Sequence, residues 1–150
     1  MIEKIEKVHI RQFSFNSDDY RSELELRDKV LRKPLGMNLY DENLEADKND
    51  VHIGAFINNR IVGVLILTIL NSNKLKMRQV AVDEDFRAMK IGTGMVRFAE
   101  EYSKEKGYST MSLNARKTAV AFYEKLGYAK MSREFLEINI PHYKMSKSLI

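Results

Sequence analysis

The stretch between Val80 and Gly94 gathers the groups that an anion-binding loop requires. A strand is expected to end at Val82, a polar loop carrying Arg87 and Lys90 follows it, and two glycines open the next helix. Backbone amides at a helix N-terminus point outward with the positive end of the dipole behind them, and glycine lets a ligand approach the backbone closely. The pattern therefore predicts a phosphate-binding loop. The alternative is an ordinary capped helix that happens to contain two glycines.

Several other chemistries lack the residues that they require. The chain has no cysteine, which excludes disulfides, thiolate metal sites and a cysteine nucleophile. It contains neither a P-loop string nor a Gly-x-Ser-x-Gly elbow, and Arg97 stands where a dinucleotide fingerprint needs its third glycine. His9, His52 and His142 lie far apart in the sequence without metal-ligand spacing, so no metal is expected.

The elements around this loop follow the order β-α-β-β-β-α-β-α-β, which predicts an α/β protein with a mixed sheet and helices on its faces. Ser17, followed by two aspartates, is expected to cap the first helix, and Pro34 to end it. Asn58-Asn59 predicts a tight hairpin turn. Strands are expected over 5–13, 51–57, 60–70, 74–82, 109–114 and 143–149, helices over 17–33, 91–107 and 119–127, and a loop over 35–50.

Charge is distributed unevenly along the chain, whose 150 residues are a common length for one domain and carry a formal net charge of +4. Residues 1–50 hold 9 basic and 12 acidic side chains, a net charge of −3, whereas residues 74–133 hold 13 and 7, a net charge of +6. The basic part is suited to phosphates, and the acidic part would attract a cationic amine through Asp41, Glu42 and Glu45. A mixed solvated surface is the alternative.

The segment Arg87-Ala88-Met89-Lys90-Ile91-Gly92-Thr93-Gly94 resembles the acetyl-CoA loop of the GNAT superfamily of N-acetyltransferases, Arg/Gln-x-x-Gly-x-Gly/Ala, with Lys90 in place of its first glycine. Asn114-Ala115 and the stretch 119–128, which contains Phe122-Tyr123-Glu124-Lys125-Leu126-Gly127, are similar to a second motif of that family. Residues 27–32 and 135–142 resemble a bacterial subgroup of uncharacterised members. The resemblance implies one GNAT domain over residues 1–150. Its mixed, mostly antiparallel sheet would have six to seven strands, flanked by about four helices and splayed between the strands that end near Val82 and Asn114.

The resemblance also implies an activity, the transfer of an acetyl group from acetyl-CoA to a primary amine of a small molecule or a protein. Direct attack by the amine in a ternary complex is expected, because no cysteine is available to carry the acetyl group. The rival functions are a non-catalytic acyl-CoA-binding sensor and a basic module that docks on nucleic acid. The aromatic residues between 91 and 128 fall on stripes that should be buried, which favours a small molecule over nucleic acid.

Individual residues acquire roles through the same resemblance. Tyr123 takes the place of the general acid that protonates the departing thiolate, with a purely packed tyrosine as the alternative. Apart from the resemblance, charge and residue type place Glu42, Glu45, Glu137 and His142 on the expected acceptor side, with ordinary loop or edge-strand residues as the alternative. The expected cofactor contacts are Val80, Ala81, Val82, Arg87, Ala88, Met89, Lys90, Ile91, Gly92, Thr93, Gly94, Asn114, Ala119, Phe122 and Tyr123.

No segment of the sequence is predicted to enter a membrane. The longest apolar run, from Ile61 to Leu70, has half of the ~20 residues that a membrane helix needs. Residues 2–6 form no apolar signal segment. A cytoplasmic enzyme is therefore expected. The sequence leaves the oligomeric state open, with a homodimer as one alternative.

Overall fold

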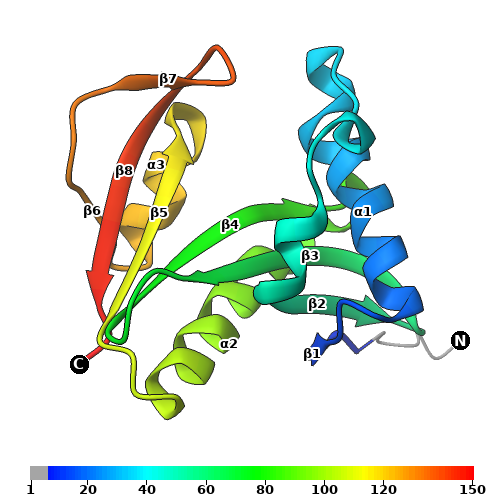
Figure 1. The fold of residues 1–150 in the computed structure, drawn as a ribbon, viewed down its shortest axis with the longest axis horizontal. Coiled ribbons are helices and arrows are strands. Elements are labelled where there is room, and N and C mark those ends of the chain that lie inside the picture. The colour runs from blue at the N-terminus through cyan, green and yellow to red at the C-terminus, as the bar shows by residue number, and fades with distance from the viewer. Residues whose placement is uncertain (1–6) are drawn as a thin grey trace, which may run out of the picture. The chain divides into compact units, whose positions relative to one another are not determined.

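The computed structural model describes residues 7–150 apart from the side chain of Ala88, and these residues form eight strands, three α-helices and five short 3₁₀ helices (Figure 1). The strands are β1 (His9–Phe13), β2 (Val51–Ile57), β3 (Arg60–Ile69), β4 (Lys74–Val82), β5 (Thr110–Arg116), β6 (Ala129–Lys130), β7 (Phe135–Glu137) and β8 (Ile140–Ser148). The α-helices are α1 (Asp18–Leu31), α2 (Ile91–Glu105) and α3 (Val120–Lys125). Short 3₁₀ helices are η1 (Lys33–Leu35), η2 (Leu39–Asp41), η3 (Glu45–Asn49), η4 (Glu84–Met89) and η5 (Lys117–Ala119).

The eight strands follow the order β1-β2-β3-β4-β5-β8-β6, and β7 also pairs with β8. The β4–β5 pair is parallel, from Lys74 opposite Thr110 to Met77 opposite Leu113. The β1–β2 pair and the pairs of β8 with β5, β6 and β7 are antiparallel. The structure thus has the mixed, mostly antiparallel sheet that the sequence predicts.

Differences from the sequence prediction are confined to short elements and element ends. The structure has eight strands rather than six to seven, and three α-helices within residues 7–150 rather than about four. The expected loop 35–50 contains η2 and η3, and β6 and β7, of two and three residues, are too short to show a period. Residues 5 and 6 of the expected first strand lie outside the described residues. Ser17 precedes α1, but its hydroxyl donates to the Ser14 carbonyl instead of capping the helix.

The chain divides into two compact units, which are described separately. The first contains residues up to 66 and residues 79–99, and the second contains residues 67–78 and 100–150. β3, β4 and α2 each contribute to both units. None of the helices within residues 7–150 is long and apolar enough to cross a membrane.

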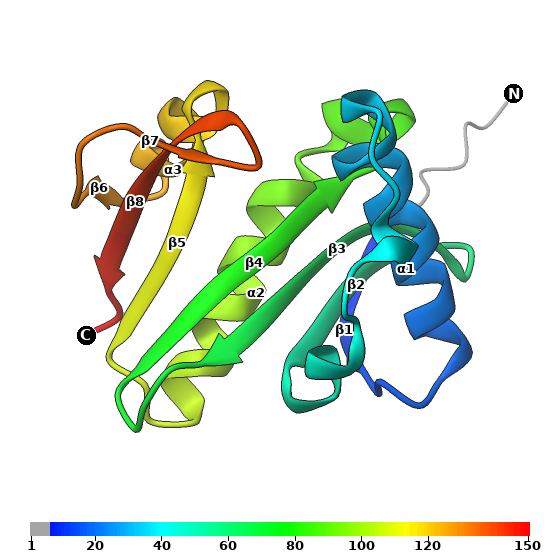
Figure 2. The same cartoon turned by 45° about the horizontal axis from the view of Figure 1, so that its top comes forward.

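In the first unit, α1 and α2 cover opposite faces of β3 (Figure 2). Val64 packs with Leu26 of α1, while its neighbour Gly63 faces α2, and successive strand residues point to opposite faces. A Cβ atom added at Gly63 would lie 2.9 Å from side-chain atoms of both Ile91 and Met95. Glycine at this position therefore allows the start of α2 to lie close to the sheet, which fixes the segment that enters the helix.

In the second unit, buried polar contacts hold the turn that follows α3. Lys147 Nζ of β8 lies 3.1 Å from both carboxylate oxygens of Glu100 and donates to the Leu126 carbonyl oxygen at 2.7 Å. The Tyr128 hydroxyl donates to Glu100 Oε2 at 2.8 Å. Burial and then the Glu100 charge raise the pKa of Tyr128 well above its ordinary value. These contacts fix α3 beside the end of β8.

Candidate functional site

A buried carboxylate fixes the point at which the predicted anion loop leaves β4. Asp83 Oδ1 accepts a hydrogen bond from the Asp85 amide at 3.1 Å, and its Oδ2 lies 3.3 Å from Lys29 Nζ and 3.4 Å from Arg60 Nη2. Burial opposes ionisation of Asp83, but the Asp85 amide and the Lys29 ammonium outweigh it, so the pKa of Asp83 lies below its ordinary value. The Asp83 amide also donates to the Val62 carbonyl oxygen at 2.8 Å.

The loop then turns at Lys90, whose φ of 56° and ψ of 32° are left-handed. Glycine adopts this conformation with little steric cost, and glycine is the residue that the GNAT pattern has at this position. The Gly94 amide donates to the Lys90 carbonyl oxygen at 3.1 Å and begins the helical ladder of α2. The amides of residues 91–93 precede that ladder, and such amides are the donors that a helix N-terminus offers to an anion.

Packing and charge distinguish the other positions of the loop. A Cβ atom added at Gly94 would lie 3.0 Å from Ile10 Cδ1, so the approach of α2 to β1 accounts for this glycine. Arg87, Met89 and Lys90 are exposed, and Arg87 Nε donates to the Val82 carbonyl oxygen at 3.3 Å. Of the other expected cofactor contacts here, Val80, Val82, Gly92 and Thr93 are half-buried, Ala81 and Ile91 are buried, and the side chain of Ala88 lies outside the described residues.

Gln79, directly before the expected cofactor contacts of β4, has a strained backbone. Its φ of 55° is left-handed, and a residue other than glycine held there costs on the order of 1–3 kcal/mol. Gln79 Oε1 accepts a hydrogen bond at 3.4 Å from Nη2 of Arg32, the residue that directly follows α1. No sequence signal marks this position, because glutamine is not a residue that favours positive φ.

The acidic residues expected on the acceptor side are largely paired with basic ones. Glu42 accepts two bonds from Arg32, 2.6 Å from Nε and 3.2 Å from Nη2. Glu45 lies 3.9 Å from Lys48 Nζ. Asp41 is exposed at the end of η2. The negative charge available to a cationic acceptor from this segment is therefore smaller than the sequence count suggests.

Four charged residues form a buried charge cluster in the first unit, namely Glu23, Arg27, Asp47 and His52, each at most 4% exposed. Arg27 Nη1 lies 2.9 Å from Glu23 Oε2 and from Asp47 Oδ2. His52 Nδ1 lies 2.7 Å from Glu23 Oε1, and His52 Nε2 lies 2.7 Å from the Asp47 carbonyl oxygen. Both ring nitrogens face acceptors, so the geometry fits a doubly protonated ring. Burial opposes that charge, but the bond to Glu23 outweighs it and raises the pKa of His52.

The second unit brings three predicted site residues together as the Glu137 cluster, which consists of Asn114, Glu137 and His142. Asn114 Nδ2 of β5 donates to Glu137 Oε1 at 3.1 Å. Glu137 Oε2 lies 3.4 Å from His142 Nε2. His142 Nδ1 lies 2.7 Å from the Ile140 carbonyl oxygen, and the Phe135 ring stacks on the imidazole with centroids 6.0 Å apart. The acceptor-side residues Glu137 and His142 thus contact each other, and Glu137 contacts an expected cofactor residue.

A tight hairpin turn creates this cluster. Ile138 and Asn139 have φ values of 45° and 60°, the conformation of a two-residue hairpin turn. The turn places Glu137 opposite Ile140 and Phe135 opposite His142, while β5 places Arg116 opposite His142. Isoleucine is unusual in such a turn, which is why the sequence did not reveal β7.

Tyr123 is buried between two rings in the second unit. Its ring centroid lies 5.0 Å from that of Phe122 and 5.8 Å from that of Tyr128. Burial raises the pKa of Tyr123 to about 12, so the hydroxyl carries its proton at neutral pH. The residue is therefore both well packed and protonated. Phe122 and Ala119, the neighbouring expected cofactor contacts, are half-buried.

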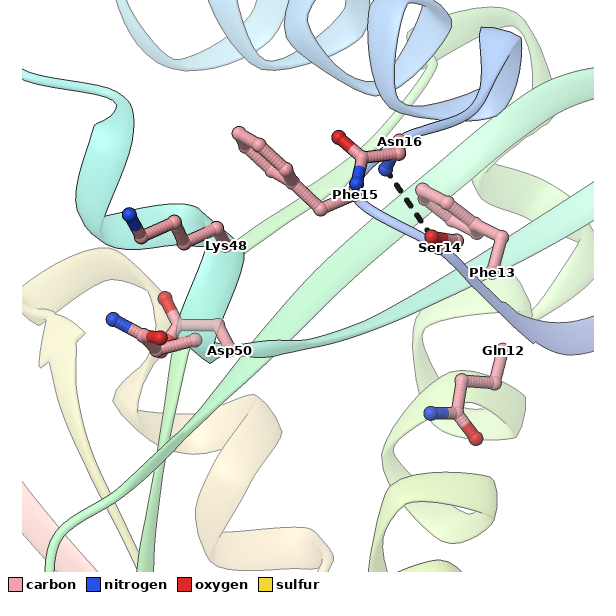
Figure 3. Close-up of a pocket in the computed structure, with 8 residues that line it drawn as sticks. Gln12, Phe13, Ser14, Phe15, Asn16, Lys48 and Asp50 are labelled. Atoms are coloured by element: carbon pink, nitrogen blue, oxygen red, sulfur yellow. Dashed lines mark hydrogen bonds between the residues drawn. The ribbon is translucent and has the colours of Figure 1, made fainter.

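A hollow of about 750 Å³ opens beside the end of β1 (Figure 3) and involves none of the predicted site residues. It is lined by Gln12, Phe13, Ser14, Phe15, Asn16, Lys48, Asn49 and Asp50. The rings of Phe13 and Phe15 also lie 5.8 Å and 6.3 Å from the His52 ring. This side of the first unit therefore borders the buried charge cluster.

Comparison with known proteins identifies the family. A family model described as the acetyltransferase (GNAT) domain matches residues 17–149. The chain belongs to the GNAT acetyltransferases. A Bacillus subtilis protein named as an acetyltransferase is 31% identical over 135 residues, which cover 88% of this chain and 91% of that protein. The expected resemblance to bacterial GNAT proteins is confirmed, and an acetyltransferase is favoured over a sensor or a nucleic-acid module.

Solved GNAT structures share the fold. The crystal structure of a Lactobacillus plantarum protein described as an N-acetyltransferase has a TM-score of 0.84 at 18% identity and covers 98% of this chain and 100% of its own. An aminoglycoside 6'-N-acetyltransferase complexed with coenzyme A has a TM-score of 0.74 at 20% identity, with 95% and 97% covered. The GNAT fold that the sequence predicts is confirmed.

Proposed function

We propose that this GNAT enzyme transfers the acetyl group of acetyl-CoA directly to a primary amine of a small molecule or a peptide. The observation that carries the proposal is the loop between Asp83 and Gly94. It combines a left-handed turn at Lys90, a helix start whose amides 91–93 precede the ladder, and the exposed cations Arg87 and Lys90. Such a helix start suits the pyrophosphate of CoA.

The proposed cofactor contacts are assigned unit by unit. In the first unit, the amides of residues 91–93 with Arg87 and Lys90 would hold the pyrophosphate, and the backbone of residues 80–82 would pair with the pantetheine amides. In the second unit, Asn114, Ala119, Phe122 and Tyr123 would lie beside pantetheine. The solved relative that holds coenzyme A supports a CoA site in this fold.

Positioning and proton transfer would supply most of the rate enhancement. The chain contains no cysteine to carry the acetyl group, which favours attack by the amine within a ternary complex. Tyr123, protonated at neutral pH because burial raises its pKa to about 12, is the proposed donor to the departing thiolate. A cytoplasmic location stays a prediction, supported by the requirement for acetyl-CoA.

The loop assignment is tested by calorimetric titration of the purified chain and its Gly92→Asp variant with CoA. The new carboxylate would stand where the pyrophosphate belongs, so CoA binding should be abolished. Asn71→Asp is the control, because it adds the same charge at an exposed turn residue without a change of size. Unchanged CoA affinity in folded Gly92→Asp would overturn the loop assignment, and no CoA binding by the unaltered chain would overturn the proposed cofactor.

A further inference from the structure

We infer that Glu137 is the base that removes a proton from the acceptor ammonium, and that Asn114 and His142 are positioning residues that orient its carboxylate. This inference rests on the proposed function. It uses only contacts within the second unit. The observation that carries it is the Glu137 carboxylate, which Asn114 and His142 contact from two sides and which is still open to solvent.

The Glu137 carboxylate is both accessible and oriented. The Glu137 side chain is 46% exposed, whereas that of His142 is 4% exposed. An acceptor can therefore reach the carboxylate but not the imidazole. The Asn114 amide fixes Oε1 at 3.1 Å, and Asn114 is expected beside pantetheine, so Glu137 would lie near the bound thioester. A base must lie within hydrogen-bond reach of the proton that it takes.

His142 borders Glu137 without tying up its carboxylate. His142 Nδ1 lies 2.7 Å from the Ile140 carbonyl oxygen, which anchors the imidazole. A charge-assisted bond between His142 Nε2 and Glu137 Oε2 would measure about 2.7–2.9 Å, but the two atoms lie 3.4 Å apart. His142 therefore limits the positions of the carboxylate by contact and leaves it available to an acceptor.

Two other carboxylates of the second unit, those of Glu134 and Glu100, differ from Glu137 in their partners. Glu134 lies 3.0 Å from Lys117 Nζ, and Glu100 lies 3.1 Å from Lys147 Nζ. Lysine partners stabilise a carboxylate in its charged form. Glu137 instead contacts the Asn114 amide and the His142 imidazole, which orient its carboxylate without pairing it with a lysine. The neighbouring charged groups are Arg116, opposite His142 in β5, and the Lys117–Glu134 pair.

Two protons leave the acceptor nitrogen during the reaction, and one proton reaches the sulfur. The acceptor ammonium loses one proton to Glu137, and the freed amine attacks the thioester carbonyl carbon. The C–N bond forms, the C–S bond breaks, and the electron pair leaves on the CoA sulfur. Tyr123, the proposed donor, gives its proton to the sulfur. The nitrogen releases its second proton to water, and water returns a proton to Tyr123. The first proton passes from the exposed Glu137 to water.

The experiment measures release of free CoA thiol with a panel of primary amines. Each amine is compared with an analogue that carries fluorine atoms on the carbon β to the nitrogen. The fluorinated amines are weakly basic and already neutral at the assay pH, so they need no base. For an ordinary amine, Glu137→Gln should lower kcat/KM by ~100- to 10,000-fold, and for its fluorinated partner the loss should largely disappear. Glu134→Gln is the control, because Glu134 lies directly before β7 and its side chain is similarly exposed at 41%. This variant should leave both rates unchanged.

His142→Asn tests the positioning role. Asparagine can still donate to the Ile140 carbonyl oxygen, but it removes the imidazole edge that borders Glu137. If His142 positions the carboxylate, the variant should lose kcat/KM with ordinary amines and keep most of it with their fluorinated partners. A merely structural role would lower the free energy of unfolding and lower both rates alike.

Three outcomes would contradict the inference. Equal rates for Glu137→Gln and Glu134→Gln would show that Glu137 takes no part in the reaction. An equal loss with both members of an amine pair would show that Glu137 does not act as the base. Absence of thiol release by the unaltered enzyme with every amine would overturn the proposed function itself, and the role of Glu137 would fall with it.

Discussion

Each unit of the molecule contains a glutamate that faces a histidine, and the two pairs are built in opposite ways. In the first unit, Glu23 and His52 lie 2.7 Å apart and are at most 1% exposed, and both nitrogens of the ring meet acceptors. In the second unit, Glu137 and His142 lie 3.4 Å apart, and the Glu137 side chain is 46% exposed. Both members of the pair are therefore buried in the first unit, whereas in the second unit the histidine is buried and the glutamate is open to solvent.

The difference separates a structural pair from a chemical one. In the buried charge cluster both ring nitrogens of His52 meet acceptors, and no acceptor molecule can reach the pair. Its bonds join α1 to η3 and β2, so they fix the segment that carries the acidic residues. The Glu137 cluster is held more loosely, and its carboxylate is open to solvent. We expect substitutions in the first to change stability, and substitutions in the second to change rate.

The largest expected effect comes from breaking the buried charge cluster. Arg27→Ala leaves Glu23 and Asp47 without their shared cation in the interior, so the free energy of unfolding should fall by about 3–5 kcal/mol. Urea denaturation measures this loss. Lys104→Ala, which breaks the exposed 3.5 Å bridge to Glu101, is the control and should cost less than ~1 kcal/mol. Similar losses for the two variants would contradict a structural role for the cluster.

The next effect concerns the buried tyrosine of the second unit. If Tyr123 protonates the departing thiolate, Tyr123→Phe should lower turnover by ~100- to 10,000-fold with CoA affinity nearly unchanged. Tyr128→Phe removes the same atom from the adjacent ring and should lower stability but not turnover. Rates are measured where chemistry limits turnover. Near-full activity of Tyr123→Phe would make Tyr123 a packing residue only.

A smaller effect should appear when pH is varied. The pKa of His52 is raised in the folded chain, so its contribution to stability is complete below about pH 6.5 and is lost as pH rises through the folded value. The free energy of unfolding should fall by at most ~1.4 kcal/mol per pH unit over that range. Denaturation of the unaltered chain and His52→Gln between pH 6 and 9 tests this. Parallel curves for the two proteins would contradict a charged His52.

The smallest effect is expected on the acidic segment. Replacing Asp41, Glu42 and Glu45 together with their amides should raise the apparent acceptor KM by only about two- to threefold, and less at high salt. Two of these carboxylates are already paired with Arg32 and Lys48. Steady-state assays at two salt concentrations measure the change. A rise of tenfold or more would assign acceptor binding to this segment rather than to the Glu137 cluster.

The sequence predicted the elements that carry a period or a strong turn signal. The hairpin at Asn58-Asn59, with φ values of 50° and 64°, and the strands on each side of it follow from residue type alone. The contacts within the buried charge cluster did not, because Glu23 and His52 are 29 residues apart and nothing local marks them as partners. Gln79 and Ile138 have left-handed backbones that their residue types do not favour. Such positions are set by tertiary packing.

The most direct test compares Glu23→Gln with Glu137→Gln in two measurements, urea denaturation and amine-dependent release of free CoA thiol by the folded protein. Glu23→Gln should lose about 3–5 kcal/mol of stability with the rate of the folded fraction nearly unchanged. Glu137→Gln should keep its stability within ~0.5 kcal/mol and lose at least ~100-fold in rate. If Glu137→Gln instead loses stability and keeps its rate, the separation of a structural pair from a chemical pair is wrong.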